Sequence, residues 1–185
     1  TGGGKTEAYL ACASFSMFYR RLIDKEDYGT DVIMRYTLRL LTAQQFQRAA
    51  TLICSMEVVR RENIEKFGEN SFSIGIWVGS ATTPNDVRSA IYGLNDVKRK
   101  GRESFNLILL QCPWCSAEMG PVKNHERGEK YKILGFEKSE GSLKVFCNDN
   151  KCRFHSFSFF VRYRFCVQHP CSFMNDNENV SFSLF

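Results

Sequence analysis

The sequence predicts an α/β fold in which a mostly parallel sheet is flanked by helices. Segments with apolar residues at helical spacing alternate with short β-branched segments, and the first helical segment directly follows a glycine-rich turn. In addition, two pairs of closely spaced cysteines predict a small metal-binding insert.

Composition limits the classes of protein to consider. The 185 residues are 43% hydrophobic, which is enough to bury a sizeable core. Lysine and arginine number 25 against 20 acidic residues, a net charge of +5 that is compatible with a polyanionic partner without requiring one. No apolar run approaches the roughly 18 residues of a membrane span, so no membrane association is expected. The spacing of the cysteines favours metal ligation in a reducing compartment over disulfides, so the cytoplasm is the expected location.

The first three elements follow from periodicity and capping signals. A helix is expected over residues 5–23, with its apolar face made by Ala8, Cys12, Phe15, Tyr19 and Leu22. A strand is expected over residues 32–41, which are largely β-branched and apolar. Thr42 stands three residues before Gln45, a capping-box spacing, so a second helix is expected to start there and to end at residues 66–70.

The later elements continue this alternation. Ile74, Ile76 and Val78 recur at period two and predict a strand. Asn85 or Asp86 is expected to cap a helix that runs to about Lys98, and residues 106–111 are expected to form a further strand.

The opening residues "TGGGKT" fit the closing half of the phosphate-binding pattern G-x-x-x-x-G-K-[ST]. Glycines allow consecutive backbone N–H groups to converge on an anion, and the helix that follows adds its partial positive charge. Lys5 would bridge the β- and γ-phosphates of a nucleotide, and the Thr6 hydroxyl would bind Mg²⁺. The alternative is a flexible glycine-rich segment beside a chance Lys-Thr pair.

Three blocks and a C-x-x-C pair together resemble the first motor domain of superfamily 2 DNA helicases, most closely the helicase subunit of bacterial DISARM anti-phage systems. The blocks are "TGGGKTEAYL", "MRYTLRLLTAQQFQRA" and "IGIWVGSATTPN", and the resemblance covers about residues 1–155. It implies a RecA-like P-loop NTPase fold and binding of ATP with Mg²⁺. The residues that it assigns to the nucleotide and metal are Thr1, Gly2, Gly3, Gly4, Lys5 and Thr6.

The same resemblance implies contacts to the DNA backbone. The second block looks like motif Ia and the third like motif Ib, which assigns DNA contact to Arg39, Thr42, Gln45, Gly79, Ser80 and Thr83. The alternative for Arg39 is a solvated strand end, and Thr42 is expected to cap a helix under either interpretation. The cation cluster at residues 98–102 is interpreted as a solvated surface rather than as a backbone contact.

The cysteine pairs predict a tetrahedral zinc site made by Cys112, Cys115, Cys147 and Cys152. Alternatives are a redox-active C-x-x-C pair, buried thiols without metal, and His155 as a substitute ligand. The segment between the pairs is expected to have little apolar surface of its own. Cys12 and Cys54 are expected to be core residues, and Cys166 and Cys171 are not assigned a role.

One departure from the helicase pattern limits the expected activity. No aspartate in the chain is followed by glutamate, so the motif II pair that positions Mg²⁺ and the attacking water is missing. We therefore expect a truncated P-loop motor domain over 1–111, a zinc-ribbon-like insert over 112–155, and a divergent or frameshifted tail over 156–185.

The function predicted from the sequence is a fragment of an ATP-dependent DNA helicase or translocase, inactive alone, that works with DNA and with other subunits of a defence complex. The alternatives are a zinc-dependent nucleic-acid-binding module without ATPase function and a small P-loop kinase or GTPase. The motif Ia-like and Ib-like blocks argue against the kinase or GTPase, which does not need them.

Overall fold

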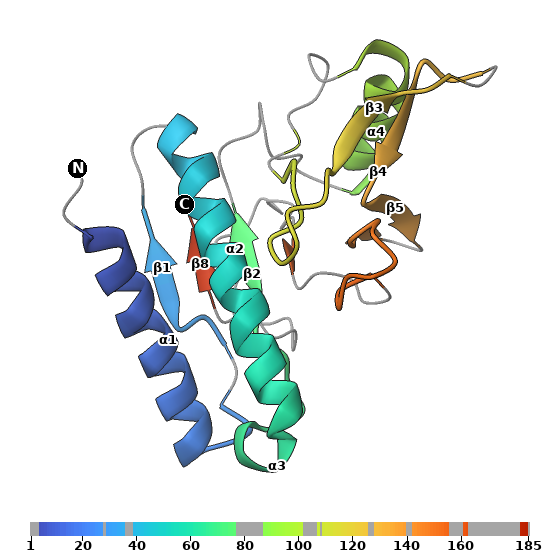
Figure 1. Cartoon of the computed structure of the whole chain (residues 1–185). Coiled ribbons are helices and arrows are strands. Elements are labelled where there is room, and N and C mark those ends of the chain that lie inside the picture. The colour runs from blue at the N-terminus through green and yellow to red at the C-terminus, as the bar shows by residue number, and fades with distance from the viewer. Residues whose placement is uncertain are drawn as a thin grey trace. The chain divides into compact units, whose positions relative to one another are not determined.

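The structure is a computed structural model that describes residues 4–27, 29–35, 39–76, 87–101, 107, 109–125, 128–139, 142–155, 161–162 and 182–184 (Figure 1). The helices are α1 (Lys5–Ile23), α2 (Arg39–Glu62), α3 (Ile64–Phe67) and α4 (Val87–Lys100). The strands are β1 (Val32–Met34), β2 (Ile74–Ile76), β3 (Gly120–Lys123), β4 (Tyr131–Leu134), β5 (Phe136–Ser139), β6 (Ser142–Val145), β7 (Val161–Arg162) and β8 (Phe182–Leu184).

Backbone contacts divide the described residues into two compact units. The first contains residues 4–76 together with β8, and the second contains residues 87–155 together with β7. The domain boundaries predicted from the sequence, at residues 111 and 155, stay predictions. No helix in the described part of the chain has the length and apolar character to cross a lipid bilayer.

The first unit contains three parallel strands. β8 lies between β1 and β2 and pairs with both in parallel, so that Phe182 is level with Val32 on one side and with Ile74 on the other. All three residues of β2 are buried, as expected for a strand that is covered on both faces. That these strands belong to a P-loop NTPase sheet stays a prediction.

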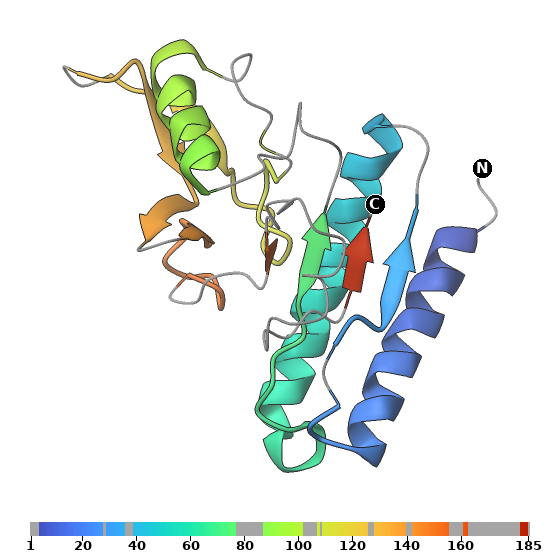
Figure 2. The same ribbon diagram turned by 180° about the vertical axis from the view of Figure 1, so that it is seen from behind.

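The long helices run opposite to the strands. In both views, the first residues of α1 and α2 lie at the end of the first unit toward which β1, β2 and β8 point (Figures 1 and 2). The positive ends of two helix dipoles and the carboxyl ends of three strands are therefore at the same end, where α/β folds bind their ligands.

The C-terminal part of α2 is fixed to the chain before β2 by a buried charge cluster. The Glu57 carboxylate is fully buried and accepts hydrogen bonds from Arg60 (2.9 and 2.5 Å), from Arg61 (2.9 Å) and from the Phe72 backbone N–H (3.1 Å). Arg60, itself 5% exposed, also donates to the Gly68 carbonyl at 2.7 Å. This network positions residues 68–72, which lead directly into β2.

Helix α1 has the predicted bounds, but the prediction of its buried face was wrong. Ala13, Met17 and Arg21 are buried, whereas the predicted core face is exposed at Ala8, Cys12, Phe15, Tyr19 and Leu22. Apolar residues occur around much of this helix, so spacing alone allowed two apolar faces.

Because Met17 is 2% exposed and Phe15 is 70% exposed, their replacement by alanine should have unequal costs. Met17→Ala is expected to lower the free energy of unfolding by about 2–5 kcal/mol, since it leaves a cavity. Phe15→Ala is expected to change it by less than about 0.5 kcal/mol. Urea unfolding of both variants measures this difference, and a greater loss for Phe15→Ala would contradict the packing described here.

The predicted start of the second helix was also wrong. Strand β1 ends at Met34 and α2 begins at Arg39, so Thr42 lies inside the helix and is not its N-cap. Leucine and arginine are good helix formers, and an apolar run of this length fits either a strand or a helix end.

The second unit consists of α4 and two antiparallel hairpins, β3–β4 and β5–β6. The strand predicted over residues 106–111 is not present in the described part of that segment, where Gln111 only forms an isolated bridge with Glu118. The segment between the cysteine pairs does contribute to a core, contrary to expectation: Met119, Phe136 and Val145 are buried. Apolar and charged residues alternate along these strands, so the sequence contains no apolar run that would have predicted a buried face.

Candidate metal centre and nucleotide site

The first cysteine pair lies in a tight turn that presents both sulfurs to the same side. The backbone N–H groups of Trp114 and Cys115 donate to Cys112 Sγ at 3.4 and 3.5 Å. The turn is closed by hydrogen bonds from Ser116 N to Cys112 O (2.9 Å) and from Cys112 N to Ala117 O (2.8 Å). Amide donors around a sulfur stabilise its thiolate form, which is the form that binds a metal.

The second pair is built in a similar way after strand β6. The Asp149 N–H donates to Cys147 Sγ and the Phe154 N–H donates to Cys152 Sγ, both at 3.4 Å. Cys152 N also donates to Asp149 O at 3.0 Å, which closes the turn between the two cysteines.

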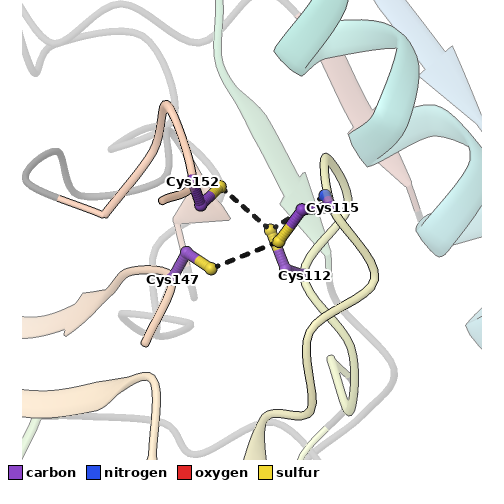
Figure 3. A group of neighbouring side chains, drawn as sticks. All are labelled: Cys112, Cys115, Cys147 and Cys152. Atoms are coloured by element: carbon purple, nitrogen blue, oxygen red, sulfur yellow. Dashed lines mark hydrogen bonds between the residues drawn. The ribbon is translucent and has the colours of Figure 1, made fainter. Parts of the chain in front are cut away.

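The two turns face each other and bring four sulfurs together (Figure 3). Cys112 Sγ lies 3.9 Å from Cys152 Sγ, and Cys115 Sγ lies 3.5 Å from Cys147 Sγ. All four sulfurs lie within 4.8 Å of one another. A tetrahedral zinc with Zn–S bonds of about 2.3 Å places its sulfurs about 3.8 Å apart, so the donor set and its spacing fit this ion. The predicted clustering is confirmed, and the identity of the metal remains a proposal.

The protonation state of the cysteine thiols affects metal binding, because only the thiolate form binds a metal ion. Burial raises the pKa of the Cys112 thiol to about 11, and burial likewise raises the pKa of Cys147 above its ordinary value. Without a positive ion these two groups would keep their protons at neutral pH, whereas a bound cation would favour both thiolates. The four cysteines are free thiols, which excludes a disulfide within the C-x-x-C pair in this structure.

Residues that support the cluster were not predicted from the sequence. The rings of Trp114 and Phe154 lie 5.6 Å apart and join the two turns. His155 Nδ1 lies 2.9 Å from the Cys147 carbonyl oxygen, and His155 is not one of the clustered metal-ligand candidates. The C-P-W-C sequence shows that Trp114 lies inside the first turn. Its partner, Phe154, is 40 residues further along the chain, so no local sequence pattern predicted their contact.

Three of the residues assigned to phosphate binding are described. Gly4 is the N-cap residue of α1 and has left-handed backbone angles (φ 63°, ψ 11°), which glycine adopts without strain. Among the described residues, no side chain caps this helix, so its first-turn N–H groups have no described side-chain acceptor. Lys5 is exposed and Thr6 is half-buried. Thr1, Gly2 and Gly3 lie outside the described residues.

The residues assigned to DNA contact are only partly described. The backbones of Arg39 and Thr42 belong to the first turns of α2, at the same end of the unit as Gly4. Gln45 is half-buried, and its Oε1 atom is buried without a hydrogen-bond partner. Phosphate oxygens require donors, so only the amide nitrogen of Gln45 fits the predicted role. Gly79, Ser80, Thr83 and the expected caps Asn85 and Asp86 lie outside the described residues.

The cations at the end of α4 pair with nearby carboxylates. Arg99 and Lys100 lie 2.9 and 3.7 Å from Asp96, and Lys98 lies 3.2 Å from Glu129. These pairs support the interpretation of this cluster as a solvated surface.

The other cysteines give a mixed result. Cys54 is buried, as predicted, but Cys12 is exposed and lines an open hollow between α1 and β1. Cys166 and Cys171 lie outside the described residues.

Comparison with known proteins supplies one informative match. The chain is 35% identical over 167 residues to DISARM protein DrmA of Bacillus paralicheniformis. The match covers 83% of this chain and 14% of DrmA, so the chain spans a small part of the length of this relative. No protein-family model matches the chain.

Proposed function

We propose that this chain is part of the first motor domain of an ATP-dependent DNA helicase or translocase that serves in anti-phage defence. The similarity to DrmA supports the defence role and a complex with other subunits. The observation that carries the motor assignment is the position of Gly4, Lys5 and Thr6, at the free N-terminus of α1 and at the end toward which three parallel strands point.

The chemistry proposed for this end is phosphate binding. The left-handed Gly4 turns the chain so that the following N–H groups can converge on an anion, and the dipole of the 19-residue helix α1 adds positive potential. Lys5 supplies the charge for the β- and γ-phosphates, and Thr6 supplies a hydroxyl ligand for Mg²⁺. When bound, Mg²⁺ neutralises charge on the phosphates.

The proposed DNA contacts on α2 belong to the same end of the first unit. Arg39 and Thr42 are in the first turns of α2, where backbone N–H groups and a cationic side chain favour a phosphate of the DNA backbone. The zinc proposed at the four cysteines would act as a structural crosslink between two turns, without a role in ATP chemistry.

Nucleotide titration tests this proposal. The 185-residue chain is expected to bind ATP weakly in the presence of Mg²⁺. Lys5→Ala is expected to reduce this affinity at least about tenfold, because a charge-assisted contact with the phosphates is lost. Lys25→Ala removes the same charge from the loop after α1 and serves as the control. Equal binding by the wild type and Lys5→Ala in calorimetry would contradict the assignment.

Hydrolysis is not expected from the chain by itself. It has no Asp-Glu pair to position Mg²⁺ and the attacking water, so the transition state lacks essential partners. DNA-stimulated ATP turnover by the purified chain that disappears in Lys5→Ala would show that other residues fulfil this role.

The four converging sulfurs favour one second candidate, a zinc-dependent nucleic-acid-binding module without ATPase function. DNA binding that depends on zinc and is indifferent to both ATP and Lys5→Ala would favour this candidate over the motor fragment.

A further inference from the structure

A cavity in the second unit has not been assigned a role above. It has a volume of about 450 Å³ and lies between α4 and the strands β4 and β5. This volume falls within the range of about 300–1,000 Å³ that is typical of small-molecule sites. All residues that line it belong to the second unit, and Figure 1 shows α4 beside β4.

The inner part of the cavity is apolar. Ile91 and Leu94 reach it from successive turns of α4, and Ile133 and Phe136 reach it from β4 and β5. Leu94 and Phe136 are 6% and 7% exposed, so they form a firm floor that is part of the core. Such a floor favours a flat apolar body.

The rim of the cavity carries lysine side chains that have no carboxylate partner among the described residues. Lys98 lies 3.2 Å from Glu129, so this pair contributes little net charge. Lys132 and Lys138 also line the cavity and are exposed, and neither forms an ion pair with any described residue. Glu137 lines the rim too, so the three lining lysines exceed the two lining glutamates by one positive charge. The rim is therefore suited to an anion near Lys132 and Lys138.

A side-chain amide that can form hydrogen bonds with a ligand lies beside the apolar part of the cavity. Asn95 is an exposed residue of α4 that lines the cavity, and its amide carries both donors and an acceptor. An apolar floor, an amide and two cations at the rim match the three parts of a nucleotide: the base plane, the base edge and the phosphate.

We propose that this cavity binds a nucleobase, with the attached phosphates held by Lys132 and Lys138. The ligand is a base of a single-stranded nucleic acid or a free nucleotide, which present the same chemistry. This site lies in the second unit and does not depend on ATP binding at Gly4, Lys5 and Thr6, so the two proposals fail or succeed separately.

The test uses the zinc-loaded 185-residue chain and a fluorescent single-stranded oligonucleotide, with anisotropy as the readout. The double variant Lys132→Ala/Lys138→Ala is expected to weaken binding about tenfold. Loss of two phosphate contacts should also reduce the slope of log K against log salt by about 1.4. The control Lys123→Ala/Lys151→Ala removes the same charge from exposed lysines that do not line the cavity. It is expected to change binding less than about twofold.

Two further comparisons separate the cavity from general electrostatic attraction. Asn95→Leu, which removes the amide without a change of charge and without an added aromatic ring, should weaken binding of the intact strand about fivefold and leave binding of an abasic strand unchanged. Competition with a mononucleotide identifies the source of the base: displacement at micromolar concentration that is lost in Lys132→Ala/Lys138→Ala would support the site with a free nucleotide as its ligand.

Three results would overturn the proposal: equal binding of intact and abasic strands by the wild type, equal losses in the two lysine pairs, or no effect of Asn95→Leu. Thermal unfolding and zinc content of each variant establish that it is folded, and the lysine pairs and Asn95→Leu change only exposed side chains.

Discussion

Replacement of Cys147 by serine is expected to release the metal and to unfold the segment of residues 112–155. Four large apolar side chains of this segment, Met119, Phe136, Val145 and Phe154, are buried and contribute about 1.5–3 kcal/mol each. This core is small, and the exposed turns and charged residues of the segment add little burial to it. Structural zinc contributes on the order of 10–16 kcal/mol, which is large enough to decide whether the segment folds.

Elemental analysis and limited proteolysis measure this effect. The wild type is expected to contain about one zinc per chain and to resist cleavage over residues 112–152. Cys147→Ser is expected to lose both the zinc and this resistance, while α1 stays helical. Cys12→Ser removes an exposed thiol outside the cluster and is the matched control. A metal-free wild-type protein with an equally protected segment would contradict a metal-dependent fold.

The second large effect is expected from Glu57→Ala. Glu57 is 0% exposed and receives hydrogen bonds from two arginines and from the Phe72 N–H, so its removal leaves Arg60 buried without its carboxylate. The loss of one partner of a buried ion pair costs about 3–5 kcal/mol. The free energy of unfolding of the first unit should fall by this amount in denaturant titration.

Two variants give this prediction its controls. Glu65→Ala removes an exposed carboxylate from α3 and should change stability by less than about 0.5 kcal/mol. Replacement of both buried partners, Glu57→Met with Arg60→Leu, should recover part of the loss because the buried Arg60 charge is removed together with its carboxylate. If Glu57→Ala were no more harmful than Glu65→Ala, the buried network would not hold residues 68–72.

Local sequence patterns predicted the positions of the helices better than they predicted which face of a helix is buried. The bounds of α1 followed from a glycine-rich start and apolar spacing, and α4 was also predicted closely. The buried face of α1 could not be read in this way, because Phe15 and Met17 are both apolar and only the packing partner decides which is buried. The prediction of the start of α2 was wrong for a related reason, because Leu40 and Leu41 suit a strand or a helix equally.

The cysteine cluster was predictable because each pair is local and only the meeting of two pairs is a tertiary event. The Glu57 network and the cavity beside Phe136 were not predictable. Their members come from separate elements, and a buried glutamate looks like any solvated glutamate in a sequence.

The most direct test of the motor assignment is an amide chemical-shift titration of the ¹⁵N-labelled chain with ATP and Mg²⁺. The largest shifts are expected at the backbone N–H groups of Gly2, Gly3, Gly4, Lys5 and Thr6, because these donors would face the phosphates. Lys5→Ala should remove these shifts. Saturation with ATP that leaves these amides unchanged, or that shifts only residues of the second unit, would contradict the proposal.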